Sequence, residues 1–330
     1  MKKVMEVLIT GAAGFLGTNI VHACLDRGWK VRAFTLRGTP VDFIRHRNVE
    51  ILFGDVADAA AVRNAMNGAD AVIHCAGDTS FWKKQFERQR KTNVDGVRTV
   101  FQAALGLHIR KIVHTSTVDA FGYNPAGFAD ENWSEYNYAG WGYNYADTKR
   151  EGQAIALSYV RKGLDVVIIN PGSMIGPFDH TLQFGRLFKD IRDGKIPAML
   201  PGGAPWAHVR EVAGAHVTAL EKGRTGQLYI CAGVHETYAA VFGAIARSLG
   251  VKPPRFTMPP WMTVGYGYCM EFLSGFTGKK PDLNPGQARY MSVFPKYDSS
   301  KAARELGFVS LPLATMVEDA RDWYRQNGFL

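Results

Sequence analysis

The stretch Thr10-Gly11-Ala12-Ala13-Gly14-Phe15-Leu16-Gly17 decides the fold class of this 330-residue chain. It follows an apolar run at residues 4–10 and precedes a stretch of helical period that ends at Arg27-Gly28. Gly11 fits a tight strand-to-helix turn, Gly14 lets the backbone approach a pyrophosphate, and Gly17 lets the helix lie close to the sheet. The first helical amides, from Phe15 and Leu16, would face the same phosphates. At the first strand–helix junction, this turn predicts a dinucleotide site rather than an ordinary tight turn.

Apolar runs alternate with helix-length amphipathic stretches through the first half of the chain, at residues 4–10, 31–34, 49–53, 71–75, 109–115 and 166–170. Runs this uniformly apolar are typical of a parallel sheet that is covered on both faces. After residue 171 the spacing becomes irregular and Gly/Pro clusters appear. The sequence therefore predicts an α/β protein with a doubly wound Rossmann sheet in residues 1–170. Residues 171–330 are predicted to form a smaller, mixed substrate-binding region that also returns to the sheet.

The end of the second apolar run bears on the choice of nucleotide. It reads Thr35-Leu36-Arg37, without the Asp or Glu that would bind the ribose 2′-hydroxyl of NAD. Arg37, helped by Arg32, could instead hold a 2′-phosphate, so the sequence favours NADP and leaves NAD as the alternative. Further strand ends are expected near the adenine, at Asp55-Val56 and Cys75-Ala76-Gly77.

A tyrosine and a lysine four residues apart, Tyr145 and Lys149, lie between the fifth and sixth apolar runs in a helical pattern. On one helix face, the lysine would lower the pKa of the phenol and hold the nicotinamide ribose, so that Tyr145 could exchange a proton with a carbonyl or alcohol. The same spacing recurs at Tyr297 and Lys301, but only Tyr145 follows the hydroxyl cluster at residues 114–122. A hydroxyl from that cluster could donate to a developing oxyanion.

Together these motifs resemble the extended short-chain dehydrogenase/reductase family, within the NAD-dependent epimerase/dehydratase superfamily, in order and spacing over nearly the whole chain. The resemblance places Thr117 rather than Ser116 at the catalytic hydroxyl, from its distance to Phe121-Gly122. It implies that Asn93 organises the active site and that Thr115, Pro171 and Ser173 contact the cofactor. The segment at residues 208–211 departs from the family pattern and leaves the role of Arg210 open.

The tail at residues 297–308 is similar to the dihydroflavonol-reductase-like and 3β-hydroxysteroid-dehydrogenase-like branches of that family. Those branches act on bulky apolar carbonyls and alcohols of sterol, flavonoid or long-chain type. Candidate substrate contacts are Phe81, Trp82, Trp141 and Tyr143, although aromatic stripes are more often core than pocket. The alternative is an NAD-dependent sugar-nucleotide epimerase or dehydratase, in which Arg186, Lys189 and Arg192 could bind the diphosphate; the same three residues fit a solvated helix face equally well. A non-enzymatic protein on the same fold is disfavoured by Thr117, Tyr145 and Lys149.

Composition and charge limit the classes of partner that the sequence predicts. The formal net charge of +9 suits an anionic ligand or surface, but Lys and Arg are scattered and no nucleic-acid-binding motif is present. The four cysteines form no Cys/His ligand cluster, so no metal is expected. Glu6 and the glycines that follow it disfavour a signal peptide, and we expect a cytoplasmic enzyme. Besides a small-molecule substrate, a membrane surface contacted through residues 258–276 and a second copy of the chain are candidate partners.

Overall fold

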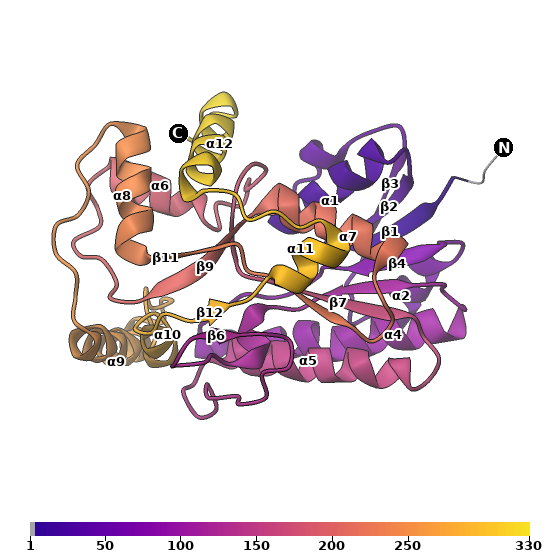
Figure 1. Cartoon of the computed structure of the whole chain (residues 1–330), viewed down its shortest axis with the longest axis horizontal. Coiled ribbons are helices and arrows are strands. Elements are labelled where there is room, and N and C mark those ends of the chain that lie inside the picture. The colour runs from indigo at the N-terminus through magenta and orange to yellow at the C-terminus, as the bar shows by residue number, and fades with distance from the viewer. Residues whose placement is uncertain (1–3) are drawn as a thin grey trace.

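The computed structural model describes residues 4–330 and is built around a seven-stranded parallel sheet (Figure 1). The strand order is β3-β2-β1-β4-β5-β7-β10. The bounds of the strands in that order are Val49–Phe53, Lys30–Thr35, Glu6–Thr10, Ala71–His74, Ile112–Thr115, Val166–Pro171 and Leu228–Cys231. The predicted doubly wound Rossmann sheet is confirmed.

Residues along each strand alternate between two apolar layers, which explains why the central strands read as unbroken apolar runs. In β1, Ile9 packs on one face of the sheet and Leu8 on the other. One face is covered by α1 (Phe15–Asp26), α7 (Val209–Lys222) and α11 (Ser300–Leu306). The other is covered by α2 (Ala59–Met66), α4 (Gly96–Gly106) and α5 (Asn144–Val160). Strands buried on both faces cannot show the polar alternation of a half-exposed sheet.

The order of the strands creates a switch point beside β1. The chain runs from β1 outward through β2 and β3, then returns to β4 on the other side of β1 and continues to β5 and β7. The crossover connections on the two sides therefore leave the carboxyl ends of β1 and β4 in opposite directions. In open parallel sheets, ligands bind in the crevice that forms at such a point.

Two strand details differ from the sequence-based prediction. The seventh strand, β10, pairs with β7 and was covered only by the general expectation of a later return to the sheet. The run at 109–115 becomes a strand only from Ile112, because α4 ends at Gly106 and is followed by a turn in which His108 adopts a positive φ of 52°. A four-residue strand that begins this close to the preceding helix is too short for periodicity to resolve.

After β7 the chain returns to the seven-stranded sheet with β10, α7 and α11. Its other segments form a second lobe around a three-stranded sheet of order β11-β9-β8. The strands span Val234–Thr237, Gly203–His208 and Ser173–Ile175. Helices α6 (Gly185–Arg192), α8 (Tyr238–Leu249) and α12 (Leu313–Gln326) pack on it around a core that includes Trp206 and Tyr324. Helices α9 (Pro260–Thr277) and α10 (Pro285–Tyr290) lie together at the edge of this lobe, and a short β12 (Lys296–Tyr297) pairs with β6 (Phe128–Ala129) (Figure 1).

None of the helices in residues 4–330 is both long enough and apolar enough to cross a bilayer.

Candidate active site

A cavity of about 620 Å³ opens at the carboxyl ends of the central strands, where the switch point predicts a ligand. Its wall comes from the segments that follow β1, β2, β3, β4, β5 and β7, together with the start of α1 and one side of α5. Of the residues that the sequence assigned to the cofactor, those lining the cavity are Gly11, Gly14, Phe15, Leu16, Gly17, Asp55, Val56, Cys75, Ala76, Gly77, Thr115, Tyr145, Lys149 and Pro171. Arg37 and Ser173 are not among the lining residues.

The glycine turn leaves no room for side chains. Gly11 has φ +70°, and a Cβ there would lie 2.7 Å from the Cα of Ala76, so β1 and the end of β4 are in direct backbone contact. A Cβ on Gly17 would lie 2.0 Å from the carbonyl oxygen of Gly11. Helix α1 begins at Phe15 with Gly14 as its N-cap, and no side chain caps its first amides. These amides and the positive end of the helix dipole suit a pyrophosphate, so the residues present fit a dinucleotide.

The segment after β2 brings Leu36 and Thr39 to the cavity wall but leaves Arg37 exposed at its margin. The Arg37 guanidinium lies over the Phe53 ring, 5.9 Å from the ring centroid. Arg32 does not assist it, contrary to the prediction. Its side chain forms an ion pair with Glu50 at 2.9 Å and a hydrogen bond to the carbonyl of Asn67, because residue 32 is in the middle of β2 rather than at its end.

The lysine of the predicted pair is buried at the floor of the cavity. Lys149 is 6% exposed, and its ammonium donates to the carbonyl oxygen of Thr115 at 2.7 Å. Burial lowers the pKa of Lys149 to about 8, because the charged form loses its hydration. The Oγ of Thr115 is engaged separately with His216, at 2.8 Å. Lys149 therefore contacts the end of β5 and also lines the cavity.

The tyrosine of the pair is half-buried in the cavity wall, and its pKa moves opposite to the sequence-based prediction. Burial, followed by the nearby carboxylate of Asp119, raises the pKa of Tyr145 above its ordinary value, while a hydrogen bond with Thr117 lowers it. The expected lowering by Lys149 does not occur in the chain by itself, since that ammonium is directed at Thr115. The phenol is therefore protonated at neutral pH.

The backbone of Thr117 is held by a buried amide pair that sequence reasoning did not identify. Asn170, at the end of β7, donates from Nδ2 to the carbonyl of Thr117 at 2.9 Å and to Gln153 Oε1 at 2.7 Å. Thr117 also caps the following turn, since its Oγ accepts from the amide of Asp119 at 3.2 Å. Ser116 lines the cavity as well, but the hydroxyl bonded to Tyr145 is that of Thr117. Asn170 thus fixes the predicted catalytic hydroxyl from the neighbouring strand.

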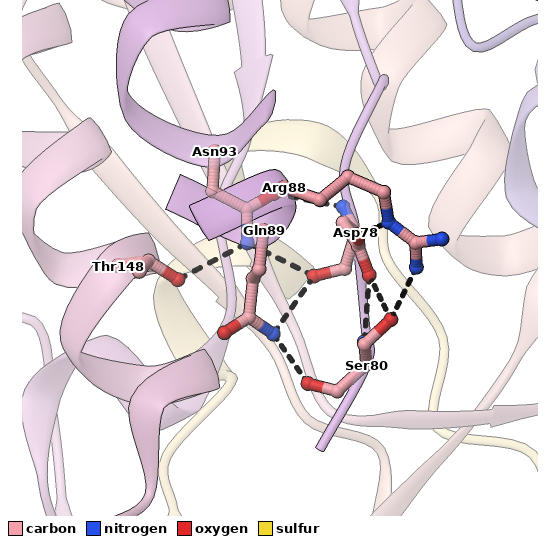
Figure 2. Close-up of polar contacts among 6 residues, drawn as sticks. All are labelled: Asp78, Ser80, Arg88, Gln89, Asn93 and Thr148. Atoms are coloured by element: carbon pink, nitrogen blue, oxygen red, sulfur yellow. Dashed lines mark hydrogen bonds and ion pairs between the residues drawn. The ribbon is translucent and has the colours of Figure 1, made fainter. Parts of the chain in front are cut away.

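Figure 2 shows Asn93 joining the loop after β4 to α5. Its Nδ2 donates to the carbonyl of Asp78 at 2.9 Å and to Thr148 Oγ at 3.1 Å, and its Oδ1 accepts from the amide of Asp78 at 2.8 Å. A π-helical turn, Lys91–Asp95, carries Asn93 and brings it to this point. Because Thr148 precedes Lys149, Asn93 holds the part of α5 that carries Lys149 and the loop after β4 together. Asn93 itself does not line the cavity.

An ion pair between Arg88 and Asp78 holds the outer part of the loop after β4. Arg88 donates to Asp78 at 2.8 Å and to Ser80 at 2.7 Å, and the buried Gln89 donates to the carbonyl of Ser80 (Figure 2). Burial alone would raise the pKa of Asp78, but hydrogen bonds from Ser80 and Arg88 outweigh it and hold the pKa below its usual value. Asp78, Ser80 and Arg88 line the cavity, although no sequence motif indicated them.

None of the four candidate substrate residues is among the residues that line the cavity, although Phe81 and Tyr143 lie beside Tyr145. Phe81 stacks on Tyr143, with ring centroids 5.8 Å apart, and its centroid is 6.2 Å from that of Tyr145. Tyr143 is buried and its hydroxyl donates to Asp119 at 2.8 Å. Trp141 packs against Tyr138 in the same cluster. Trp82 lies apart from these rings, with the Lys84 ammonium 5.3 Å from its ring centroid.

A carboxylate is buried within this aromatic cluster. Asp119 is 5% exposed, and burial raises its pKa to about 6 against the opposing effect of the hydrogen bond from Tyr143. Its negative charge is one reason why the pKa of Tyr145 is raised. Sequence reasoning included Asp119 only as part of the hydroxyl cluster, because its tyrosine partner is 24 residues away.

The chain belongs to the NAD dependent epimerase/dehydratase family. The model of that family matches residues 7–232, which include the glycine turn, Tyr145 and Lys149. Sterol demethylase protein B from Methylococcus capsulatus is 32% identical over 99% of this chain and 100% of its own length. A dTDP-glucose 4,6-dehydratase from Streptomyces niveus is 27% identical over 98% of this chain and 94% of its own length. The crystal structure of gox2253 superposes with a TM-score of 0.85 at 30% identity, covering 98% of this chain and 99% of the other.

This membership confirms the predicted resemblance, and the protein is an NAD(P)-dependent enzyme of the extended short-chain dehydrogenase/reductase kind. Arg210, whose role the sequence left open, is held by an ion pair outside the cofactor cavity. Its guanidinium pairs with Asp319 at 3.6 Å, and the same carboxylate contacts His208 at 3.1 Å. Arg210 therefore links α7 to α12 and is not part of the cofactor cavity.

Proposed function

We propose that this enzyme interconverts a carbonyl and an alcohol on a bulky apolar substrate of sterol, flavonoid or long-chain type, with NADP as its cofactor. The observation that carries the proposal is the position of Tyr145. Its half-buried ring lines the nucleotide cavity on one side and contacts the aromatic cluster that includes Phe81 and Tyr143 on the other. A substrate reaching this phenol from the second lobe would therefore pass apolar side chains.

The residues around Tyr145 have separate roles in this proposal. A bound nicotinamide would supply or accept the hydride. The raised pKa of Tyr145 keeps its phenol protonated at neutral pH, which suits a proton donor to a carbonyl oxygen. Thr117 would donate a second hydrogen bond to the same oxygen as charge develops on it. Lys149 would bind the sugar next to the nicotinamide and replace the proton that Tyr145 gives up.

Two further observations support an apolar substrate. The relative from Methylococcus capsulatus is named for sterol demethylation, and it matches this chain over its full length. In addition, the cations considered for a substrate diphosphate are largely engaged: Arg186 pairs with Asp190 at 3.4 Å and Arg192 with Asp193 at 2.8 Å. Burying about 200 Å² of apolar substrate surface would contribute about 5 kcal/mol before ordering costs, which corresponds to a dissociation constant of roughly 0.2 mM.

The second candidate function is a sugar-nucleotide epimerase or dehydratase. It is favoured by the family name and by the likeness to the dTDP-glucose dehydratase, and it would use the same cofactor cavity. The two functions differ in outcome, since an epimerase leaves the nicotinamide in its starting redox state.

A turnover panel tests the proposed function. The panel contains apolar ketones and aldehydes of steroid, flavonoid and long-chain type, the matching alcohols, and UDP-, GDP- and dTDP-sugars, each with the reduced or oxidised nucleotide. We expect a change in nicotinamide absorbance with at least one apolar carbonyl or alcohol, and inert sugar nucleotides. Turnover of a sugar nucleotide alone would overturn the proposal and establish the second candidate.

The NADP preference rests on Arg37. Its guanidinium is exposed at the margin of the cavity, beside the strand end where the ribose of a dinucleotide is expected. A charge-assisted contact with a 2′-phosphate contributes ~1.5–3 kcal/mol, or roughly 10–100-fold in affinity. Replacing Arg37 with Ala should therefore weaken NADP(H) binding by about that factor and leave NAD(H) binding within about twofold. Fluorescence titration of the reduced nucleotides measures both.

Arg32→Ala is the matched control, because this arginine within β2 is paired with Glu50 and should not affect nucleotide choice. Equal weakening of both nucleotides by Arg37→Ala, or a preference of the unmodified enzyme for NAD, would show that Arg37 does not bind the 2′-phosphate.

A further inference from the structure

Helix α9 (Pro260–Thr277) packs against the protein with small residues and turns its large apolar residues outward. Thr263, Gly267 and Ser274 are its buried residues. A Cβ on Gly267 would lie 3.0 Å from the carbonyl oxygen of Asn284, so α9 and the start of α10 are in close contact along this side. Trp261 and Phe276, on the opposite side, are 73% and 77% exposed. This is the reverse of an ordinary surface helix, whose apolar side faces the core.

The outward residues form one continuous stripe, which we call the α9 stripe: Trp261, Tyr268, Phe272 and Phe276. Their spacing of seven, four and four residues keeps them on one face of a helix, over a length of about 22 Å. Among residues 4–330, twelve large apolar side chains are exposed, and six of them belong to the 18 residues of α9. Single exposed apolar residues are ordinary, but a cluster of this kind marks an interaction surface.

The flanks of the α9 stripe are positively charged. Lys252 and Arg255 precede the helix and Lys279 and Lys280 follow it, and all four are exposed without an ion pair among the described residues. The one charged residue within α9, Glu271, lies off the stripe and pairs with Lys83 at 2.9 Å. An apolar stripe that contains aromatic rings and is flanked by lysines matches the interface of an anionic bilayer, where rings enter the headgroup boundary and cations meet phosphates.

We propose that the α9 stripe docks this enzyme on the surface of an anionic lipid bilayer. The charges favour this occupant over a second copy of the chain. Pairing two copies through the same face would bring the two sets of lysines and arginines toward one another, and like charges at an interface oppose association. A bilayer with anionic lipids instead offers an apolar layer to the stripe and negative charge to the cations at both ends.

The docked surface is tied to the active site by direct contacts. Lys83, which pairs with Glu271 of α9, follows Phe81 and Trp82 in the chain. Asn284, at the start of α10, donates to the carbonyl of Phe81. Arg289 bonds both the Tyr268 hydroxyl, at 2.8 Å, and the Trp141 carbonyl, at 3.1 Å. A substrate dissolved in the bilayer would thus enter beside the aromatic cluster next to Tyr145, a route that rests on the proposed function, whereas the docking itself does not.

Vesicle flotation of the full chain tests the proposal. The vesicles are phosphatidylcholine alone or phosphatidylcholine with about a third phosphatidylglycerol. We expect the protein to float with the anionic vesicles and to remain largely unbound with the neutral ones. Phe272→Ser combined with Phe276→Ser should lower the affinity for anionic vesicles at least tenfold, and so should Lys279→Glu combined with Lys280→Glu. Circular dichroism and thermal melting show whether each variant is folded.

Two matched controls separate the surface from general effects. Val309→Ser removes an apolar residue exposed to 50% outside α9, and Lys30→Glu combined with Lys222→Glu makes the same change in net charge at exposed lysines elsewhere. Both should float like the unmodified protein. Turnover of a water-soluble carbonyl substrate should be unchanged in the Phe272/Phe276 variant, so a failure of the proposed chemistry would be visible independently of vesicle binding.

Three results would overturn the docking proposal. One is the absence of flotation with anionic vesicles. Another is flotation that the stripe variants do not weaken or that the charge controls weaken equally. The third is a concentration-dependent dimer in solution that the Phe272/Phe276 variant abolishes, which would make a second copy the occupant of the stripe.

Discussion

Replacing Tyr145 with Phe is expected to lower kcat by about 10²–10⁴-fold, the range typical of a lost general acid or base. The change removes one hydroxyl from a ring that is already half-buried among aromatic side chains, so packing should survive. Nucleotide affinity should stay within about twofold, because the glycine turn and the start of α1 are untouched. Steady-state kinetics together with nucleotide titration measure the two effects separately.

Tyr297→Phe is the control for that variant, because Tyr297 belongs to the second Tyr-x-x-x-Lys pair. Tyr297 is buried and donates to the carbonyl of Gly122 at 2.6 Å, so its loss should reduce stability by about 1 kcal/mol and leave kcat nearly unchanged. If Tyr145→Phe retained full activity, or if Tyr297→Phe lost as much, Tyr145 would not be the proton donor.

The second large effect concerns Lys149, where activity and stability should change in opposite directions. Lys149→Met should lower kcat/KM by at least about 100-fold, since the buried ammonium supports the proton transfer. Lowering the pKa of Lys149 from 10.5 to about 8 corresponds to about 3 kcal/mol of unfavourable charging in the folded state at neutral pH. Losing the hydrogen bond to Thr115 offsets part of this gain. The free energy of unfolding of the variant should therefore be about 1–2 kcal/mol higher than that of the unmodified enzyme at pH 7.

The stability difference between Lys149→Met and the unmodified enzyme should depend on pH, because the pKa of Lys149 differs between the folded and the unfolded chain. Between about pH 8 and 10.5 the folded chain has released the Lys149 proton while the unfolded chain still binds it. In that window the stability of the unmodified enzyme should rise with pH through this group, and the advantage of Lys149→Met should shrink. Denaturant titrations of both proteins at pH 7 and pH 10 measure the difference, with Lys301→Met as control. An advantage that grows toward pH 10, or a variant already less stable at pH 7, would contradict the assigned burial of the charge.

The parts of the site that sequence could predict are those encoded within a few residues. The glycine turn needs specific backbone space at Gly11 and Gly17, and no other residue type fits there. Tyr145 and Lys149 share a helix face by their spacing alone. The apolar runs predicted the sheet because both of its faces are covered.

What sequence could not predict depends on contacts between distant segments. Asn170 binds the carbonyl of a residue 53 positions away, and Tyr143 binds Asp119 across 24 positions. The direction of the Tyr145 pKa follows from this three-dimensional arrangement, since Lys149 bonds Thr115 while Asp119 lies close to the phenol. Arg32 and Arg37 are alike in sequence, and only the structure reveals that the first is paired with Glu50 within the sheet.

The fate of the hydride in the turnover panel tests the central claim most directly. The enzyme is incubated with a reduced nicotinamide nucleotide that carries deuterium at the transferred position, and products and nucleotide are analysed by mass spectrometry. Net oxidoreduction of an apolar carbonyl should place one deuterium on the carbinol carbon of the alcohol product for each nucleotide oxidised. A sugar nucleotide that is converted with no net oxidation of the nucleotide, while every apolar carbonyl remains unlabelled, would contradict the account.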